Sequence, residues 1–502
     1  MRYLIFIVAV LSSLNLKAQN KQDYIWLFGF GGDDSYIFDF NQSPYEFEQE
    51  NLPIPMGSFN GSICDNEGNL LFFTNGCSIY NSQYELMENG DSLNYDIIIE
   101  LGLANCVGGY IGNQDVLIIK SPGSEKLYYV IHKTLIYNGP NENDSIPIHY
   151  TLVDMSANNG LGRVIEKNKD VYVEKECLFF YLTGIHHINQ TDFWFLQPIA
   201  DDSIIITHLI DEEGIHRYPD QDANNFFERD KSSASGTAKF SPDGTQYAIY
   251  NETDGLLIYG FDRSTGLLDF QEKVVPFDTT GIGIFCSVEW SSNSRFIYTA
   301  TTTKLHQVDT WEDDIQENGI RLIDTYNGTQ DPFSTIFFLM AQAPDCKIYM
   351  CPTSSTNSYH VINSPNELGA NCDFVQNGIQ LPRTSTRASM PNFPRFRVDE
   401  EEKCDPTIVS VFGDAVYYRR DLVVYPSPST GLFTIDLPED FSSGRLVVTD
   451  IHAQILRDTQ IDHLTFEGEL QLYNLPEGIY NIEIYPSDNK ERIFYSKQVV
   501  KI

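Results

Sequence analysis

The feature that most constrains the fold is a short phrase that recurs through the middle of the chain. In each copy a strand-like run is followed by a tight turn around Asp or Asn and then by a second strand-like run. The three clearest copies place the turn residue at Asp243 (followed by Gly244), Asn293 and Asp345, so neighbouring copies are 50 and 52 residues apart. A period of roughly 40–60 residues built from antiparallel strands is typical of a β-propeller.

Weaker copies extend the repeat towards the N-terminus. One spans residues 61–73, two degenerate copies begin near residues 121 and 188, and a pair of strand-like runs at 24–28 and 35–40 comes first. We count seven units, which predicts an all-β fold with a seven-bladed β-propeller over residues 20–397; six or eight blades are the open alternatives. We expect the earliest and latest strands of this region to share one blade and so close the ring.

The last eighty or so residues have a different pattern. Residues 432–437, 445–449 and 480–485 alternate apolar and polar side chains with period two, and Pro-containing turns separate the runs. This pattern predicts a small immunoglobulin-like β-sandwich over residues 422–502. An acidic stretch that begins with Asp399-Glu400-Glu401-Glu402 predicts a linker over residues 398–421.

Three ordered motifs lie in this C-terminal region: an opening Pro-Ser-Pro with a following glycine, a central Gly-Ile-Tyr and a basic end. Together they resemble the type A C-terminal sorting domain of the type IX secretion system, in which Asn is usual where Ser427 stands here. The resemblance implies that the secretion machinery and its sortase are partners and that the chain passes through the periplasm to the outer cell surface or the medium. An ordinary adhesive β-sandwich is the alternative. The residues that the resemblance assigns to the sorting signal are Pro426, Pro428, Gly431, Gly478, Tyr480 and Lys497. We expect Gly431 and Gly478 to supply turn geometry that a side chain would block.

The repeats also resemble known proteins. The phrase Phe240-Ser241-Pro242-Asp243-Gly244 resembles that of WD-repeat-like propellers, and the runs at 26–29, 68–76 and 390–393 are similar to those of Bacteroidetes-type secreted proteins. Members of that group join an N-terminal propeller to adhesive modules or a sorting tail, which implies a fold and a location rather than an activity. Cys346 stands where glycine is usual, so we expect its turn to be strained or disulfide-linked.

The N-terminus and the composition both favour export. A basic start, a short apolar run and Lys17-Ala18-Gln19 predict a signal peptide over residues 1–19, and we expect no transmembrane segment. The formal net charge of −37 argues against nucleic acid and anionic membrane as partners, because no basic stripe is present to neutralise phosphates. The nine cysteines are an odd number, so at least one thiol is free or paired between chains.

Few residues suggest site chemistry. His186 and His187 with Asp192 are candidates for metal binding or acid–base work, but we interpret His187 and Asp192 as parts of a structural network beside Trp194. Asp33-Asp34 is a candidate calcium site, although it lacks the alternating ligand run and is better read as a solvated turn. We therefore predict no catalytic, cofactor or metal residue, with calcium as the one candidate ion. The run Asp211-Glu212-Glu213 is read as an exposed loop.

Two function classes remain. We favour a non-catalytic binding or adhesion module for a glycan or protein partner. The alternative is a propeller-type polysaccharide hydrolase or lyase, for which no local spacing selects a carboxylate pair among the 70 acidic residues. A pocket with two facing carboxylates would favour the enzyme, and a shallow aromatic face would favour binding.

Overall fold

In the computed structural model, the chain folds into two compact units, Met1–Glu402 and Lys403–Ile502. The predicted signal peptide (1–19) and most of the predicted linker (399–417) lie outside the residues that the structure describes. The described residues are 20–42, 47–94, 106, 109–110, 112–136, 145–174, 177, 180–199, 203–224, 236–251, 254–275, 285–386, 388–398, 418–437, 441–450, 455–462, 466, 468–476, 478–487 and 493–501.

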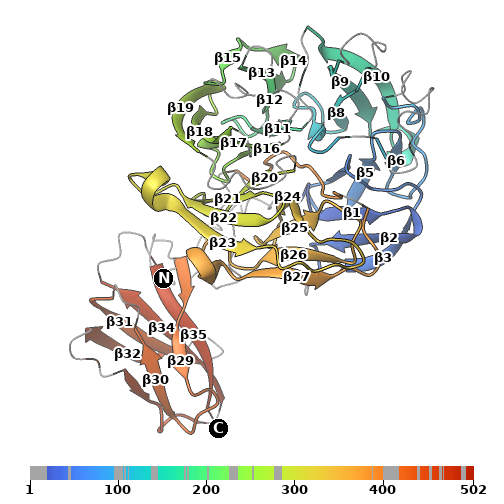
Figure 1. The fold of residues 1–502 in the computed structure, drawn as a ribbon. Coiled ribbons are helices and arrows are strands. Elements are labelled where there is room, and N and C mark those ends of the chain that lie inside the picture. Colours follow the sequence, from blue (N-terminus) through green and yellow to red (C-terminus); the bar gives the residue numbers. More distant parts are fainter. Residues whose placement is uncertain are drawn as a thin grey trace, which may run out of the picture. The chain divides into compact units, whose positions relative to one another are not determined.

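Unit 1 consists of antiparallel sheets whose strands are neighbours in the sequence (Figure 1). The first sheet contains β1 (Ile25–Gly29), β2 (Gly32–Asp39) and β3 (Phe47–Leu52). The second contains β4 (Gly61–Cys64), β5 (Leu70–Thr74) and β6 (Ile79–Asn81). The third contains β7 (Val116–Lys120), β8 (Leu127–Lys133), β9 (Ile148–Asp154) and β10 (Arg163–Tyr172). The fourth contains β11 (Thr183–His186), β12 (Phe193–Ile199), β13 (Ile204–Asp211), β14 (Gly214–Arg217) and β15 (Gln221–Asp222).

Three more sheets contain the clearest sequence repeats. The fifth comprises β16 (Gly236–Phe240), β17 (Gln246–Asn251), β18 (Gly255–Asp262) and β19 (Leu267–Val274). The sixth comprises β20 (Ser287–Trp290), β21 (Phe296–Ala300), β22 (Lys304–Asp309) and β23 (Ile320–Thr325). The seventh comprises β24 (Phe337–Gln342), β25 (Ile348–Pro352), β26 (Ser358–Ile362) and β27 (Phe374–Gln380). Short helical turns lie at Asn158–Gly160, Ile315–Gly319 and Gly369–Cys372.

Apolar side chains between neighbouring sheets arrange them in a ring. One cluster joins the second, third and fourth sheets, and others join the fourth to the fifth, the fifth to the sixth and the sixth to the seventh. Two further clusters join the first sheet to the second and to the seventh. Each sheet therefore packs on the one before and the one after it, which is the architecture of a β-propeller. The described residues form seven sheets, and the blade count stays a prediction because the other residues do not enter this count.

The expectation that the earliest and latest strands share one blade is wrong. β1 pairs with β2 in a sheet of their own with β3, and β27 pairs with β26 in the seventh sheet. β1 and β27 do not pair with each other in the described residues, and side chains close the ring instead. Trp26 of β1 packs on Tyr349 of β25 with ring centroids 6.0 Å apart.

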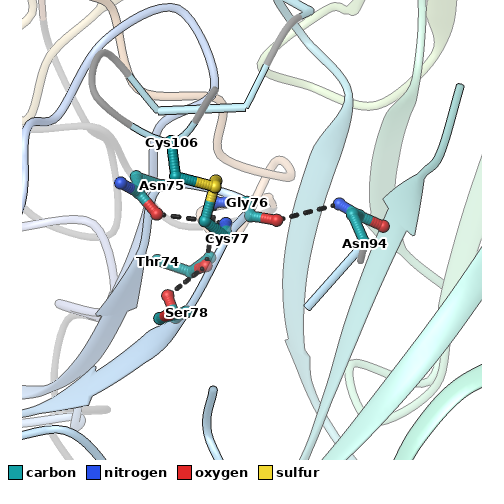
Figure 2. Close-up of a disulfide and its surroundings, with 7 residues drawn as sticks. All are labelled: Thr74, Asn75, Gly76, Cys77, Ser78, Asn94 and Cys106. Atoms are coloured by element: carbon teal, nitrogen blue, oxygen red, sulfur yellow. Dashed lines mark hydrogen bonds between the residues drawn. A yellow bond between two sulfur atoms is a disulfide. The ribbon is translucent and has the colours of Figure 1, made fainter. Parts of the chain in front are cut away.

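A disulfide fixes the turn after β5. Cys77 is bonded to Cys106, 29 residues further along the chain (Figure 2). The turn is also held by the Asn94 side chain, whose amide donates to the Gly76 carbonyl at 3.1 Å. Cys346 is in a disulfide as well and has φ of +65°, so the expectation that its turn is strained or disulfide-linked is confirmed. Buried thiols are found at Cys64, Cys177, Cys286, Cys351 and Cys372.

Unit 2 contains two sheets around one apolar cluster. The larger sheet has the order β28 (Tyr418–Asp421), β35 (Ile493–Lys501), β34 (Gly478–Pro486), β31 (Ser443–Asp450) and β32 (Ile455–Asp462). The smaller one has the order β29 (Val423–Tyr425), β30 (Leu432–Asp436) and β33 (Glu469–Gln471). Residues 418–421, assigned to the linker from the sequence, form β28 and pair in parallel with β35.

Candidate functional site

The first strands of the sheets surround the centre of the propeller. β1 contacts β4, β4 contacts β7, β11 contacts β16, β16 contacts β20, and β20 contacts β24. A propeller that binds or converts a ligand in a central funnel would expose side chains of these strands there. The geometry of this centre therefore tests the two function classes drawn from the sequence.

Residues 388–398, which we call the central segment, run along these first strands. The Asn392 side-chain amide donates to the Val116 carbonyl of β7 at 2.9 Å and to the Leu182 carbonyl just before β11 at 3.0 Å. The Arg395 backbone N–H donates to the Gly184 carbonyl of β11 at 2.7 Å. Arg397 forms an ion pair with Asp23, which lies just before β1. The central segment, which lies near the end of unit 1 in the sequence, thus ties distant sheets together at the centre.

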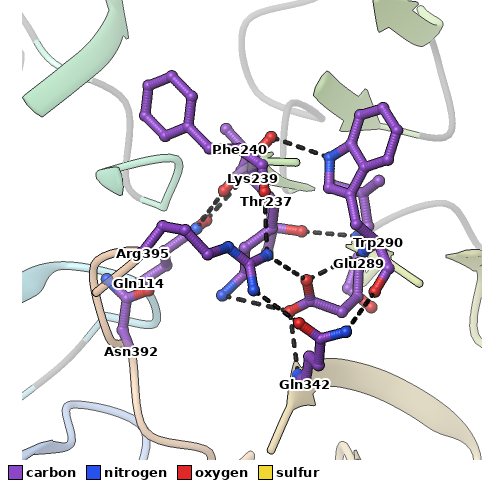
Figure 3. A network of polar contacts seen from close by, with 12 residues as sticks. Gln114, Thr237, Lys239, Phe240, Glu289, Trp290, Gln342, Asn392 and Arg395 are labelled. Carbon is purple, nitrogen blue, oxygen red and sulfur yellow. Dashed lines mark hydrogen bonds and ion pairs between the residues drawn. The ribbon is translucent and has the colours of Figure 1, made fainter. Parts of the chain in front are cut away.

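The Arg395 guanidinium lies at the middle of a polar cluster (Figure 3). It donates to the Glu289 carboxylate at 3.2 Å, to the Gln342 side-chain carbonyl at 2.8 Å and to the Phe240 backbone carbonyl at 2.9 Å. These three partners come from β20, β24 and β16, so one side chain joins the fifth, sixth and seventh sheets. Arginine suits this role because its planar fork presents several donors in fixed directions.

The charge of Glu289 is compensated from several sides. Its carboxylate accepts from the backbone N–H groups of Trp290 at 3.0 Å and Gln342 at 3.2 Å, and the Lys239 ammonium lies 3.6 Å away. Burial lowers the pKa of Lys239, and Glu289 opposes that shift. The cavity beside these residues has a volume of only about 30 Å³, enough for about one or two water molecules.

Sequence reasoning missed this cluster. A usable signal was present, because Lys239 and Glu289 occupy the same position of two repeats, four residues before the turn residue, where the third repeat has Ala341. Their partner Arg395 carries no repeat signal, and it lies 106 residues from Glu289 in the sequence.

The predicted blade-turn residues lie in the turns between first and second strands. The Asp243 carboxylate accepts from the Ser241 hydroxyl at 2.6 Å and from the Thr245 backbone N–H at 3.0 Å. Gly244 has φ of +71°, and a Cβ there would lie 2.7 Å from the Arg263 side chain of the same sheet. A side chain at this position would therefore need both a strained backbone and a displaced neighbour.

The equivalent turns use related contacts. Asn293 accepts from the Ser291 hydroxyl at 2.7 Å, and its backbone N–H donates to the Asn366 side chain at 3.0 Å. Asp345 accepts from the Tyr349 hydroxyl at 2.8 Å, and burial raises the pKa of its carboxyl group.

His187 and Asp192 lie at the two ends of the turn that joins β11 to β12. The His187 backbone N–H donates to the Asp192 carbonyl at 2.8 Å, while its ring Nε2 lies 3.3 Å from the Ser264 carbonyl of the fifth sheet. The Asp192 carboxylate accepts from the Asn189 side chain at 2.7 Å instead of contacting a histidine ring. His186 points away into the core, where it lies on Phe193 and burial lowers its pKa to about 4.

The candidate ion site at Asp33-Asp34 lies at the start of β2. The Asp33 backbone carbonyl accepts from the Gln49 side chain at 3.0 Å, and the Asp34 carboxylate lies 3.9 Å from the Arg383 guanidinium. Across the described part of the chain, no three His, Cys, Asp or Glu side chains are grouped to hold a metal ion. Nor is any helix in that part long and apolar enough to cross a bilayer.

The three C-terminal motifs meet at one end of unit 2. Ser427 in the opening motif accepts from the Val500 backbone N–H at 3.0 Å, and the Ser429 N–H donates to the Val500 carbonyl at 2.9 Å. Pro426 and Pro428 on either side of Ser427 are exposed. The opening motif is thus anchored to the last strand, β35, which also carries Lys497.

The central motif contributes to the core of unit 2. Tyr480 is buried, and its hydroxyl donates to the Pro476 carbonyl at 2.7 Å. Gly431 has φ of +118°, and a Cβ there would lie 3.0 Å from the Lys501 side chain, as expected for a glycine-requiring position. At Gly478 the nearest atom to such a Cβ is 3.8 Å away, so the turn-geometry explanation does not hold for Gly478.

Residues 423–501 match the family model of the secretion system C-terminal sorting domain. Such a domain of the type IX system directs secretion to the cell surface or the extracellular space. No curated protein matches the chain.

Solved structures resemble the chain at low identity. A putative 6-phosphogluconolactonase from Bacteroides uniformis is 11% identical, with 67% of this chain and 91% of that chain covered and a TM-score of 0.39. The periplasmic gluconolactonase PpgL from Pseudomonas aeruginosa is 10% identical, covers 72% and 97%, and has a TM-score of 0.40. PorZ, a surface component of the type IX secretion system of Porphyromonas gingivalis, is 10% identical, covers 93% and 68%, and has a TM-score of 0.30. These values assign no activity to the chain.

Proposed function

We propose that this exported protein acts at the cell surface as a non-catalytic binding or adhesion module, and that its propeller holds a glycan or protein partner. The cell-surface or extracellular location follows from the sorting domain at 423–501. The observation that favours the non-catalytic class is the filled centre of the propeller, which leaves no central funnel for a substrate, so we place the binding surface away from the centre.

Two features of that centre argue against a central catalytic funnel. Its cavity of about 30 Å³ is far below the roughly 300–1,000 Å³ of small-molecule sites. The two carboxylates that line it among the described residues, Glu289 and Asp23, are each paired with an arginine of the central segment. Glycoside hydrolysis needs two carboxyl groups that flank a substrate bond, with one of them protonated. Each of these carboxylates is already held by a guanidinium group beside a cavity that fits only one or two waters, so neither flanks a space for a substrate bond.

The test uses the purified chain and a panel of insoluble polysaccharides. We expect the chain to sediment with at least one of them, or with whole cells of a surface partner, while reducing ends in the supernatant stay at the level of a heat-unfolded control. Release of reducing ends or unsaturated products above that control would support the hydrolase or lyase alternative and overturn the proposal.

We further propose that the type IX machinery reads the tail after periplasmic transit and that its sortase removes the tail and attaches the protein to the surface. A chain truncated at Asp421 should fold but remain periplasmic in a host with this system. Fusion of residues 422–502 to a periplasmic reporter should move the reporter out of the cell. Surface delivery of the truncated chain would contradict this part of the proposal.

A further inference from the structure

A second, larger cavity lies between the third and fourth sheets, away from the centre. Its volume is about 330 Å³, within the range of small-ligand sites. It is bounded by β8, β9 and β10 on one side and by β13 and β14 on the other, which are neighbours in Figure 1. The polar and aromatic side chains in its wall are Tyr129, Tyr150, Asp170, His208, Glu213 and Arg217.

The irregularity of β10 accounts for the space. Its pairing with β9 shifts register between Glu166 and Lys169 and again between Asp170 and Tyr172. β14 on the facing sheet is only four residues long. The cavity thus lies where the bulged strand β10 faces the short strand β14.

His208 is the unexplained group in this wall. Its side chain lies in β13, is 1% exposed and stacks on Phe195 with ring centroids 4.7 Å apart. Neither ring nitrogen has a hydrogen-bond partner within the described part of the chain. Burial and the Arg217 charge lower the pKa of His208 to about 4, so the ring is neutral at physiological pH. A buried polar group without a hydrogen-bond partner destabilises the folded state. The ring lines the cavity from beneath its surface, so a ligand group that displaces the side chains covering it would supply the missing partner.

The aromatic wall offers an apolar surface. The rings of Tyr129 and Tyr150 meet edge to face with centroids 5.5 Å apart. The Tyr150 hydroxyl donates to the Glu166 carboxylate at 2.5 Å, which fixes the ring. Paired tyrosines held in this way present a preorganised surface for the C–H face of a ring-shaped ligand.

The charged groups decide the ligand chemistry. Asp170 and Glu213 are exposed acceptors, with one Asp170 oxygen 3.2 Å from Nδ1 of His149. The Arg217 guanidinium is already shared by Glu174 at 3.0 Å and Asp220 at 2.9 Å. An anionic ligand would be repelled by the carboxylates and would find the one guanidinium in use. A cationic ligand would need only acceptors, yet the wall also contains Arg217 and a neutral histidine. Hydroxyl groups, which donate and accept at once, fit this mixed set.

We propose that the cavity between β8–β10 and β13–β14 binds one sugar unit of a neutral glycan, stacked on Tyr129 and Tyr150 and hydrogen-bonded by His208, Asp170 and Glu213. This inference rests on the proposed binding function of the propeller and names its ligand class and site. Glu213 belongs to the acidic run that the sequence alone marked only as an exposed loop.

The experiment titrates the full purified chain by saturation-transfer NMR and calorimetry. The neutral probes are the methyl glycosides of glucose, galactose, mannose and N-acetylglucosamine, and the charged probes are glucosamine and glucuronate. We expect at least one neutral probe to bind and neither charged probe to bind more tightly. The double variant Asp170→Asn/Glu213→Gln should weaken that binding tenfold or more. The matched control Asp269→Asn/Glu48→Gln, which removes the same two charges at exposed positions of β19 and β3, should leave it unchanged.

A second variant separates ligand contact from folding. His208→Leu removes the unpartnered nitrogens from the core, so its unfolding midpoint should equal or exceed that of the wild type, while probe affinity falls at least tenfold. Equal affinity of the wild type and both site variants would overturn this site but leave glycan binding as the proposed function. Preferential binding of a charged probe would overturn the ligand class. If no probe binds, the inference fails, and the sedimentation experiment then decides separately whether the propeller binds a polysaccharide or a protein surface.

Discussion

Replacing Arg395 should expose how strongly the central segment stabilises the propeller. The Arg395 side chain is only 12% exposed, and Arg395→Met removes its contacts with Glu289, Gln342 and Phe240 while keeping much of its apolar stem. Breaking a buried ion pair by removing one partner costs about 3–5 kcal/mol. Glu289 keeps two backbone N–H donors and the Lys239 ammonium, so we expect the low end, about 3 kcal/mol.

The expected shift in melting temperature follows from the size of the unit. An unfolding entropy of about 2.1 cal/mol/K per residue gives roughly 0.8 kcal/mol/K for roughly 380 residues, so about 3 kcal/mol lowers Tm by about 4 °C. Differential scanning calorimetry of the purified chain measures this shift. Arg383→Met, which removes an exposed guanidinium with only long contacts, is the matched control and should change Tm by less than 1 °C.

A double variant tests the physical cause. If the penalty comes from an undercompensated buried carboxylate, Glu289→Gln in the Arg395→Met background should recover part of the lost Tm, since the neutral amide needs no countercharge. The reasoning is refuted if Arg395→Met behaves like Arg383→Met, or if Glu289→Gln lowers Tm as much in the Arg395→Met background as in the wild type.

Three further outcomes are expected. His187→Ala should lower Tm by about 1–2 °C, since it removes a weak contact between sheets, and should leave affinity for any neutral glycoside unchanged; lost binding at unchanged Tm, measured by calorimetry and titration, would make His187 a ligand residue. In the export assay with a fused reporter, Gly431→Ala should reduce the extracellular fraction more than Gly478→Ala, because only Gly431 combines a positive φ with a crowded Cβ position; equal effects would show that the backbone geometry is not what matters. Cys77→Ser should cost about 3–4 kcal/mol for a 29-residue loop, and a reductant should lower the midpoint of denaturant-induced unfolding for the wild type far more than for the variant; an equal response would exclude this disulfide as the cause.

Local patterns predicted the elements of the propeller well. Asp243 and Asn293 mark tight turns because their side chains accept hydrogen bonds from residues two positions away, and such a contact is encoded within five or six residues. The unusual turn at Cys346 could also be predicted from the sequence. Cys346 follows the turn residue Asp345 where glycine is usual, and a residue at that position adopts a positive φ. The closure of the ring was mispredicted. The strand-like runs at the two ends of the propeller have the same sequence pattern whether they pair in one sheet or pack through side chains from two sheets.

The candidate sites were much less predictable. Lys239 and Glu289 could have been found as charged residues on inner strands, but their partner Arg395 lies in a segment without periodicity. In the sequence Glu213 is one member of an acidic run that predicts an exposed loop. Only the packing of the third sheet against the fourth places Glu213 beside a cavity. In unit 2 the motifs were visible in the sequence, whereas the anchoring of Ser427 to Val500 was not.

The sequence by itself determined that this protein is built from repeated antiparallel strands and ends in a secretion tail, because period-two alternation, turn chemistry and short motifs are local properties. Only the tertiary structure decided that the central segment fills the middle of the propeller and that a cavity with an unpartnered histidine opens between the third and fourth sheets. Both depend on where a ring of packed sheets brings residues that lie tens to hundreds of positions apart, such as Arg397 and Asp23. The packing of whole sheets sets those distances, and no local pattern in the chain records them.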